Sequence, residues 1–179
     1  MRRLWQLFTA VMVLSFLVLG WIGTRIYQEM PPIPDTVVTT DGQTLIGSGE
    51  ITAGQNVWQS MGGMEVGSIW GHGSYVAPDW TADWLHREAI FILDQWAESD
   101  HNTEFDKLDN EQQAQLIARL TKLLHTNTYD LSSGTVAVDP IRVAAFESNL
   151  AHYTEVFSKG NADYAIHAGA VSDPDRLRK

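Results

Sequence analysis

The stretch that decides the fold runs from residue 57 to residue 75 and reads Val57-Trp-Gln-Ser-Met-Gly-Gly-Met-Glu-Val-Gly-Ser-Ile-Trp-Gly-His-Gly-Ser-Tyr75. It mixes glycines with aromatic and apolar residues. The pair Gly62-Gly63 is typical of a helix end, and Gly71 and Gly73 allow backbone conformations closed to other residues. Pro78 then stiffens the approach to the next helix. The stretch predicts a turn-rich segment between two helices.

The same residues resemble the haem-attachment segment of a c-type cytochrome. In the cytochrome c subunit of bacterial nitric oxide reductase, Val-Trp-Gln leads into Cys-x-x-Cys-His, and Gly-x-Gly-Ala-Tyr-x-Ala-Pro-Glu-Leu follows. Without gaps, the two cysteines fall on Gly63 and Val66, and the haem-ligating histidine falls on Gly67. The chain contains no cysteine, so thioether bonds to haem are chemically excluded.

A haem-free, cytochrome c-like domain behind one membrane helix is similar to the N-terminal region of the quinol-dependent, single-chain nitric oxide reductases. The run from Gly71 to Glu88 carries the strongest part of this resemblance. The resemblance implies a mainly α fold with one N-terminal transmembrane helix and a small cytochrome c-like helical domain without covalent haem. We expect an anchor at 1–27, a proline-containing linker with a short hairpin at 28–50, and the haem-free domain at 51–179.

The resemblance also implies a function. Enzymes of that family reduce two NO to N2O and water with electrons from membrane quinol. Haem b, haem b3 and a non-haem iron then belong to a polytopic core that one membrane helix cannot form. We therefore expect no catalytic residue and no cofactor in this chain, and we expect the membrane, the core and, through the core, quinol as its partners.

The polar end of the sequence, Asp173 to Lys179, indicates a chain truncated before further helices of the core, or a split gene. Two other hypotheses remain open. One is a stand-alone, membrane-anchored subunit that binds an oxidase or reductase core made as another chain. The other is an unrelated exported module that binds a small ligand.

Residues 4 to 24 form an uncharged, apolar run, which at ~1.5 Å per residue spans a hydrocarbon core of ~30 Å. A cleaved signal peptide is the alternative, but the run exceeds the usual ~7–15 apolar residues, and no Ala-x-Ala site follows it. Arg2 and Arg3 precede the run, whereas only Arg25 follows closely, which favours a cytoplasmic N-terminus. We expect this segment to cross the bacterial inner (cell) membrane once, with the following domain on the periplasmic or extracytoplasmic side.

All of the acidic residues lie beyond this run. Residues 28–179 carry all 22 Asp and Glu against 9 Lys and Arg, a formal balance of −13. Such a surface repels polyanions, so nucleic acid is excluded as a partner. The absence of cysteine also excludes disulfides and thiolate chemistry.

Turn and capping signals divide the rest of the chain into one hairpin and four helices. The hairpin is expected over 37–46 around Asp41-Gly42, with almost no other strand signal. Helices are expected from Thr52 to about residue 62, from Pro78 to about Glu98, from Asp109 to about His125, and from Asp139-Pro140 to Lys159-Gly160. Asp79 or Thr81 can cap the second, Asp109 and Gln112 resemble a capping box at the start of the third, and Asp139 is the expected N-cap of the fourth. Their predicted apolar faces are Leu85, Ala89, Ile92, Leu93 and Trp96; Leu116, Ile117, Leu120, Leu123 and Leu124; and Val143, Phe146, Leu150, Tyr153 and Phe157.

Without haem, a cytochrome-like fold has a cavity to fill. Aromatic side chains bury large areas, and we expect Trp58, Trp70, Tyr75 and Trp80 to fill this one. The alternative is non-covalent haem held by His72, Met61 or Met64.

The remaining polar residues indicate no metal site. The six histidines never have the i, i+4 spacing of a helical metal pair, and Asp83 with Arg87 is better explained as an ion pair on the helix surface. The tract from Gly71 to Pro78 is either a turn that begins a helix or a docking surface. In the second case Trp80, Trp84 and His86 would face a membrane-embedded partner.

Overall fold

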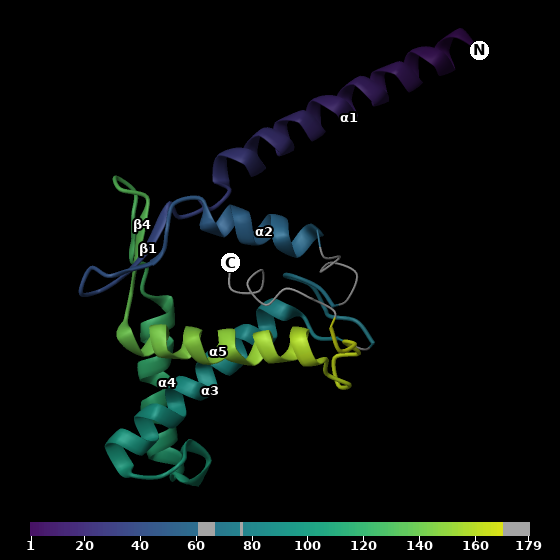
Figure 1. Ribbon diagram of the computed structural model, residues 1–179. Helices are drawn as coiled ribbons and strands as arrows, with labels where there is room; N and C mark the ends of the chain where they lie inside the picture. Colours follow the sequence, from purple (N-terminus) through teal and green to yellow (C-terminus); the bar gives the residue numbers. More distant parts are fainter. Residues whose placement is uncertain (61–66, 76, 170–179) are drawn as a thin grey trace. The chain divides into compact units, whose positions relative to one another are not determined.

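The structure, a computed structural model, describes residues 1–60, 67–75 and 77–169 (Figure 1). The chain divides into two units, residues 1–33 and residues 34–179. The first unit holds helix α1 (Arg2–Glu29), whose side chains are exposed along its length. Among the described residues, α1 is the one helix long and apolar enough to cross a membrane, a test that a signal sequence would also pass.

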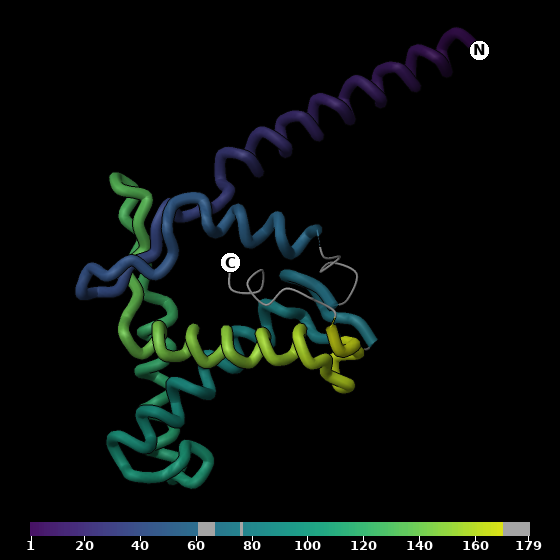
Figure 2. The backbone as a smooth tube through the Cα atoms, viewed as in Figure 1, coloured from purple at the N-terminus to yellow at the C-terminus, as the bar shows by residue number. Residues whose placement is uncertain are grey.

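A small sheet joins distant parts of the second unit. Its order is β2 (Thr44–Ile46), β1 (Thr36–Thr39), β4 (Thr135–Val138) and β3 (Tyr129–Asp130). The strands β1 and β2 form the expected hairpin, with Gly42 at a φ of 89° in its turn. β1 also pairs in parallel with β4, so residues about a hundred positions apart run side by side, as the backbone trace in Figure 2 shows.

The prediction of almost no further strand signal was wrong for β3 and β4. Asp130 accepts hydrogen bonds from the backbone N–H and the hydroxyl of Ser132, and Gly134 has a φ of 68°, so residues 130–134 make a tight turn between the two strands. The β-branched residues of Thr135-Val-Ala-Val138 then pair with β1. A β-branched run after a Ser-Ser-Gly turn is a recognisable strand signal, which the helical periodicity on both sides obscured.

The described part of this unit also contains four α-helices and the short 3-10 helix η1 (Phe105–Lys107). The α-helices are α2 (Glu50–Ser60), α3 (Trp80–His101), α4 (Asn110–His125) and α5 (Pro140–Lys159). The predicted N-terminal caps at Asp109 and Asp139 are confirmed, and of the two candidates for α3 the structure has Asp79 as the cap. Each of these carboxylates accepts a backbone N–H of its own first turn. Helix α2 differs, since it begins at Glu50 rather than after Thr52.

Helix α3 packs against both α4 and α5 and so supports two groups of buried residues. We call the first the α4 core; it lies between α3, α4 and the start of α5 and consists of Ile92, Leu93, Trp96, Ala97, Leu108, Leu116, Leu120 and Ala145. We call the second the aromatic core; it consists of Ala77, Trp80, Val156 and Ile166 with the half-buried rings of Trp58, Tyr153, Phe157 and Tyr164.

The predicted helix faces were only partly correct. On α4, Leu116 and Leu120 are buried as expected, but Ile117 is 47% exposed because it lies on the outer side of the helix. On α5, the buried residues are Ala145, Asn149 and Val156, whereas the predicted larger residues are half-buried. The small Ala145 lets α5 approach α3 closely, and the Asn149 amide donates to the Trp84 carbonyl oxygen at 3.1 Å.

Candidate functional site

The loop before α3 is organised by the carboxylate of Asp79. Its Oδ2 accepts the backbone N–H of Gly71 at 2.6 Å and the hydroxyl of Ser68 at 2.7 Å, and its Oδ1 caps α3 by accepting the N–H of Ala82. The Ser68 hydroxyl oxygen also accepts the N–H of Gly73 at 2.8 Å. The hydrogen bond from Gly71, followed by that from Ser68, holds the pKa of Asp79 below its usual value. This geometry supports the interpretation of the tract as a turn that begins a helix.

Gly67, the position of the haem-ligating histidine in the resemblance, has no room for a side chain. Its φ is 75°, a conformation that favours glycine. A Cβ atom there would lie 2.5 Å from the Pro78 carbonyl oxygen and 2.6 Å from Nε1 of the Trp80 indole. The Pro78 carbonyl group and the Trp80 ring therefore occupy the space that a ligating side chain would need. Gly63 and Val66, the two positions of the missing cysteines, lie outside the described residues.

Rings from α2, from α5 and from Tyr164, which follows α5, gather around Trp80 of α3. Its centroid lies 6.0 Å from that of Trp58, 5.7 Å from that of Phe157 and 5.5 Å from that of Tyr164, at steep or tilted angles. Trp84, one turn further along α3, stacks on Tyr153 at 5.5 Å with an interplanar angle of 5°. Edge-to-face and offset contacts of this kind contribute about 0.5–1.5 kcal/mol each beyond the area they bury.

Of the four aromatic residues that we expected to fill a cavity, two lie in the interior of the domain. Trp58 and Trp80 belong to the aromatic core, but Trp70 is 83% exposed and Tyr75 is fully exposed. Trp70 and Tyr75 point outward because the loop folds back on the Asp79 carboxylate. Their places are taken by Tyr153 and Phe157 of α5 and by Tyr164, which follows it.

A polar network closes one edge of the aromatic core. The Asp83 carboxylate accepts the hydroxyl of Tyr153 at 2.6 Å and that of Tyr164 at 3.1 Å, and it pairs with Arg87 at 3.0 Å. Arg87 also donates to the Tyr164 hydroxyl at 2.7 Å. The ion pair is therefore present as predicted, but it ties α3 to α5 and to residue 164 rather than lying free on the helix surface.

Burial and hydrogen bonding shift the ionisation of this network. Burial alone would raise the pKa of Asp83, but the hydrogen bonds from Tyr153 and Arg87 and the charge of Arg87 outweigh it and lower that pKa. Burial and the hydrogen bond to Asp83 raise the pKa of Tyr153, which stays protonated. Burial, reinforced by the positive charge of Arg87, lowers the pKa of the neighbouring His152. These groups are fixed in the states that hold the helices together, with Asp83 charged and Tyr153 neutral.

An apolar groove of about 490 Å³ lies beside the aromatic core. Residues of α2, α3 and α5 line it together with Ile69 and Trp70, and its lining includes no charged side chain among the described residues. Its volume falls within the range of about 300–1,000 Å³ that is usual for small-molecule sites.

The three residues predicted to dock on a partner differ in exposure. Trp80 is 8% exposed and packs inside the aromatic core, Trp84 is half-buried beside the groove, and His86 is exposed on α3. Docking itself stays a prediction. Within the part of the chain that the structure describes, no group of three or more His, Cys, Asp and Glu side chains is arranged to hold a metal ion.

The described residues do not fit covalent haem. There is no cysteine to form a thioether bond, and Gly67 cannot carry a ligand without displacing Pro78 and Trp80. Of the alternative axial ligands, His72 is exposed, and Met61 and Met64 lie outside the described residues.

The family model of the cytochrome c-like domain of the nitric oxide reductase protein NorB matches residues 34–179. The chain belongs to this family. The search of curated proteins found no match. The family match begins at Pro34, where the second structural unit begins. The resemblance noted for residues 57–75 therefore extends over the whole of that unit.

The network around Asp83 has no direct signal in the sequence. Tyr153 was predicted as part of an apolar face, and Tyr164 was not singled out. Aromatic residues with a hydroxyl usually find a hydrogen-bond partner when they are buried, and this signal could have pointed to a carboxylate in the core. The identity of that carboxylate, Asp83, depends on its contacts with Tyr153 and Tyr164, which lie seventy or more positions further along the chain.

Proposed function

We propose that this chain is the N-terminal membrane anchor and haem-free cytochrome c-like domain of a quinol-dependent nitric oxide reductase, and that it has a structural role. The reduction of NO would take place in a polytopic core holding haem b, haem b3 and a non-haem iron. The observation that carries the proposal is the blocked ligand position at Gly67, in a domain of the NorB cytochrome c-like family.

The blocked position supports quinol as the electron source. A domain that passes electrons from a soluble donor needs a redox group, and this chain offers neither cysteines nor space at the ligand position. If membrane quinol feeds the core directly, the extramembrane relay is dispensable. The domain can then keep the cytochrome fold while aromatic rings fill its interior.

The proposed role is to cover and stabilise the exported face of the core. The charge pattern supports an exported domain, since Arg2 and Arg3 lie in the first turn of α1, ahead of its apolar run, whereas only Arg25 closely follows that run. Half-buried Trp84 and exposed His86 remain our candidates for the contact. Trp80 would act from inside, by fixing the start of the helix that carries them.

The first test is the size of the polypeptide in the membranes that contain it, detected with an antibody to residues 80–100. We expect a band several times larger than the 20.0 kDa of this chain, together with haem b and quinol-dependent NO consumption. A discrete band near 20.0 kDa would contradict the single-chain form and favour a separate subunit bound to another core.

The second test addresses docking. His86→Ala together with Trp84→Ala should lower the amount of haem b assembled per unit of membrane protein. His101→Ala is the matched control, because His101 is an exposed histidine at the other end of the same helix. A variant that keeps its haem b content but loses turnover would contradict a structural role.

A further inference from the structure

A second pocket, of about 390 Å³, lies between α4, the start of α5 and the sheet, and shares no residue with the apolar groove. Its lining combines cationic, hydroxyl-bearing and apolar side chains: Thr40, Trp96, Arg119, Lys122, Leu123, Thr126, Thr128, Ala137, Asp139, Ile141 and Arg142. The volume is sufficient for a small organic molecule rather than for a single ion.

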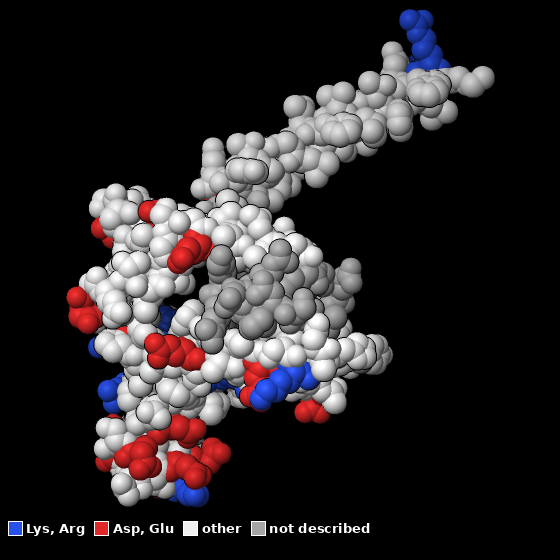
Figure 3. All heavy atoms as spheres, in the orientation of Figure 1, with Lys and Arg blue, Asp and Glu red and all other residues white. Residues whose placement is uncertain are grey.

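The charge of this pocket is opposite to that of the domain around it. The described residues from 34 to 169 contain six lysines and arginines, and three of them, Arg119, Lys122 and Arg142, line the pocket. Asp139 is the one acidic residue among the described residues of the lining, and its carboxylate already caps α5. Residues 28–179 carry 22 Asp and Glu against 9 Lys and Arg, and Figure 3 shows acidic side chains in several clusters on one face, with basic side chains among them.

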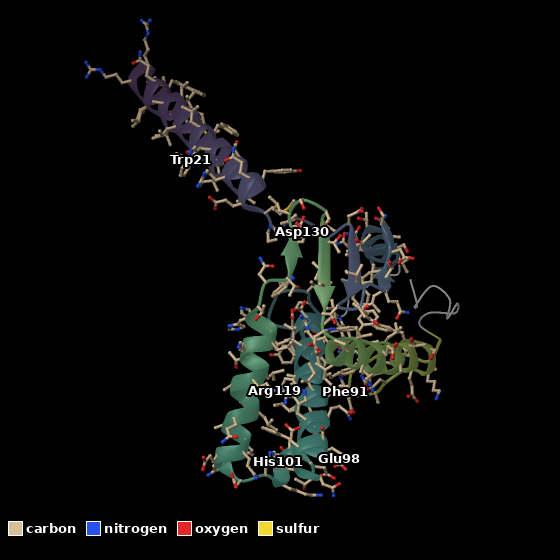
Figure 4. All side chains as sticks on the ribbon, turned by 90° about the vertical axis from the view of Figure 1, so that its left-hand side faces the viewer. Trp21, Phe91, Glu98, His101, Arg119 and Asp130 are labelled. Carbon is tan, nitrogen blue, oxygen red and sulfur yellow. The ribbon has the colours of Figure 1, made fainter. Side chains whose placement is uncertain are left out.

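Neighbouring side chains hold the two arginines in place. The Arg119 guanidinium lies 4.0 Å from the centroid of the Trp96 ring and 3.3 Å from the Asp100 carboxylate, and Figure 4 shows Arg119 on α4 next to α3. The Arg142 Nε donates to the Glu88 carboxylate at 2.6 Å. A guanidinium carries five N–H donors, so each arginine keeps donors beyond those that these pairs use. Such preorganised forks match the oxygens of carboxylate and phosphate groups.

Lys122 provides the third positive charge. It forms no ion pair within the described ranges of the chain, whereas Lys107 and Lys159 each pair with a glutamate on their own turn. Holding α3, α4 and α5 together explains the pairs Arg142–Glu88 and Arg119–Asp100, but it does not explain a lysine that lines the same pocket as those arginines. Leu123, Ala137 and Ile141 add an apolar wall, which a bare inorganic ion would leave unused.

We propose that this pocket binds a small organic anion. Its carboxylate or phosphate group would lie near Arg119, Lys122 and Arg142, and its apolar part would pack on Leu123 and Ile141. The hydroxyl groups of Thr40 and Thr128 offer further donors at the rim. The proposal is independent of docking on a membrane core, because neither the aromatic core nor the groove beside it contributes to this pocket.

The test uses the full chain in detergent micelles, labelled with 15N and titrated with butyrate, phenyl phosphate or inorganic phosphate at constant ionic strength, with chloride as the balancing salt. We expect saturable shifts of the Trp96 indole and of the Thr128 and Ile141 amides with butyrate or phenyl phosphate. Inorganic phosphate should bind more weakly, because it leaves the apolar wall uncovered. Shifts that grow linearly with every anion, or no saturation with either organic anion, would overturn the proposal.

Two variants that each remove one positive charge test whether the cations of the pocket are responsible for anion binding. Lys122→Gln should weaken binding by about tenfold, the effect of one charge-assisted hydrogen bond, without disturbing a buried pair. Lys159→Gln removes the same charge outside the pocket and should leave the affinity unchanged. Equal losses in the two variants would show general attraction to a positive charge and overturn a defined site.

Discussion

The α4 core and the aromatic core share helix α3 but are built by different means. In the α4 core, residues at helical spacing on α3 and α4 pack together, and Ile92 is completely buried. In the aromatic core, rings from α2, α3 and α5 and from residue 164 meet at steep angles, and a charged network closes one edge. Most of the first core comes from two amphipathic helices, to which Leu108 and Ala145 are added. The second needs four separate segments at the same time.

Under the proposed function, the aromatic core is the part of the fold that would correspond to the haem site of a cytochrome c. The aromatic core includes Trp80, which also blocks the ligand position at Gly67. Large rings can replace the packing that a planar cofactor would supply, because each buries a large apolar area. A core assembled in this way has little tolerance for a change of shape, since the rings contact one another and no regular helix face can adjust around them.

The largest effect should come from truncating the ring at the centre of the aromatic core. Trp80→Ala is expected to lower the free energy of unfolding by about 3–5 kcal/mol, because it removes a buried ring and leaves a cavity. Trp70→Ala is the matched control: Trp70 lies in the preceding loop and is largely exposed, so its effect should stay within about 0.5 kcal/mol. Urea unfolding of the full chain in detergent, followed by circular dichroism, measures both.

The same experiment tests whether the two cores unfold together. Because α3 runs through both, Trp80→Ala should shift a single transition. Two separate transitions, of which only one moves, would contradict this cooperativity and divide the domain into independent halves. Ile92→Ala in the α4 core would then move the other transition.

A smaller but more specific effect is expected at Gly67. Gly67→Ala should destabilise the domain by about 3 kcal/mol, since the new methyl group would overlap the Pro78 carbonyl and the Trp80 ring. Gly42 has a similarly positive φ of 89° but open space around it. Gly42→Ala should therefore cost only the conformational penalty of about 1 kcal/mol of stability. Thermal unfolding compares the two. Equal losses would mean that backbone conformation, and not the occupied space, limits position 67.

Removing a hydroxyl group at the edge of the aromatic core should lower the stability of the domain by less than Gly67→Ala does. Tyr153→Phe keeps the ring but removes the donor to Asp83, which is expected to lower stability by about 1–2 kcal/mol. Tyr75→Phe makes the same change at a fully exposed ring and should have no measurable effect. If Tyr153→Phe is also neutral in a denaturant titration, Arg87 and Tyr164 alone must satisfy the Asp83 carboxylate.

The sequence predicted the α4 core well because local rules determine it. The Asp109–Gln112 capping box and the Asp139-Pro140 helix start were identified from residues within one turn. The exclusion of covalent haem was also accessible, because the missing cysteines and the glycine at 67 are visible in the sequence. Both conclusions depend on neighbours in the chain.

What the sequence did not predict depends on distant contacts. Trp70 and Trp80 are the same residue type ten positions apart, and composition does not reveal that one is exposed and the other buried. Their exposure depends on the hydrogen bonds that Asp79 accepts from the loop. It also depends on which rings of α5, about seventy residues further along the chain, pack against Trp80. The strand β4 was missed for the same reason, since its partner β1 lies almost a hundred residues earlier.

The smallest predicted effect is the pH dependence of the loop that separates Trp70 from Trp80. The folded pKa of Asp79 lies below its unfolded value of about 3.9. Its stabilising contribution is therefore fully present above that value and is lost as the pH falls through the folded pKa. Asp79→Asn can still cap α3 but replaces one acceptor oxygen by a donor, so the hydrogen bonds from Gly71 and Ser68 are lost.

The melting temperature of Asp79→Asn should lie below that of the unchanged protein at about pH 6, and the gap should narrow as the pH falls below about 3.9. Asp106→Asn, at an exposed carboxylate on η1, is the control and should follow the unchanged protein at every pH. A gap that keeps its full size down to the acid limit of folding would show that the loop depends on the shape of the Asp79 side chain rather than on its charge. The loop would then resemble the aromatic core, in which shape decides, and not the caps of the α4 core, which local hydrogen bonding determines.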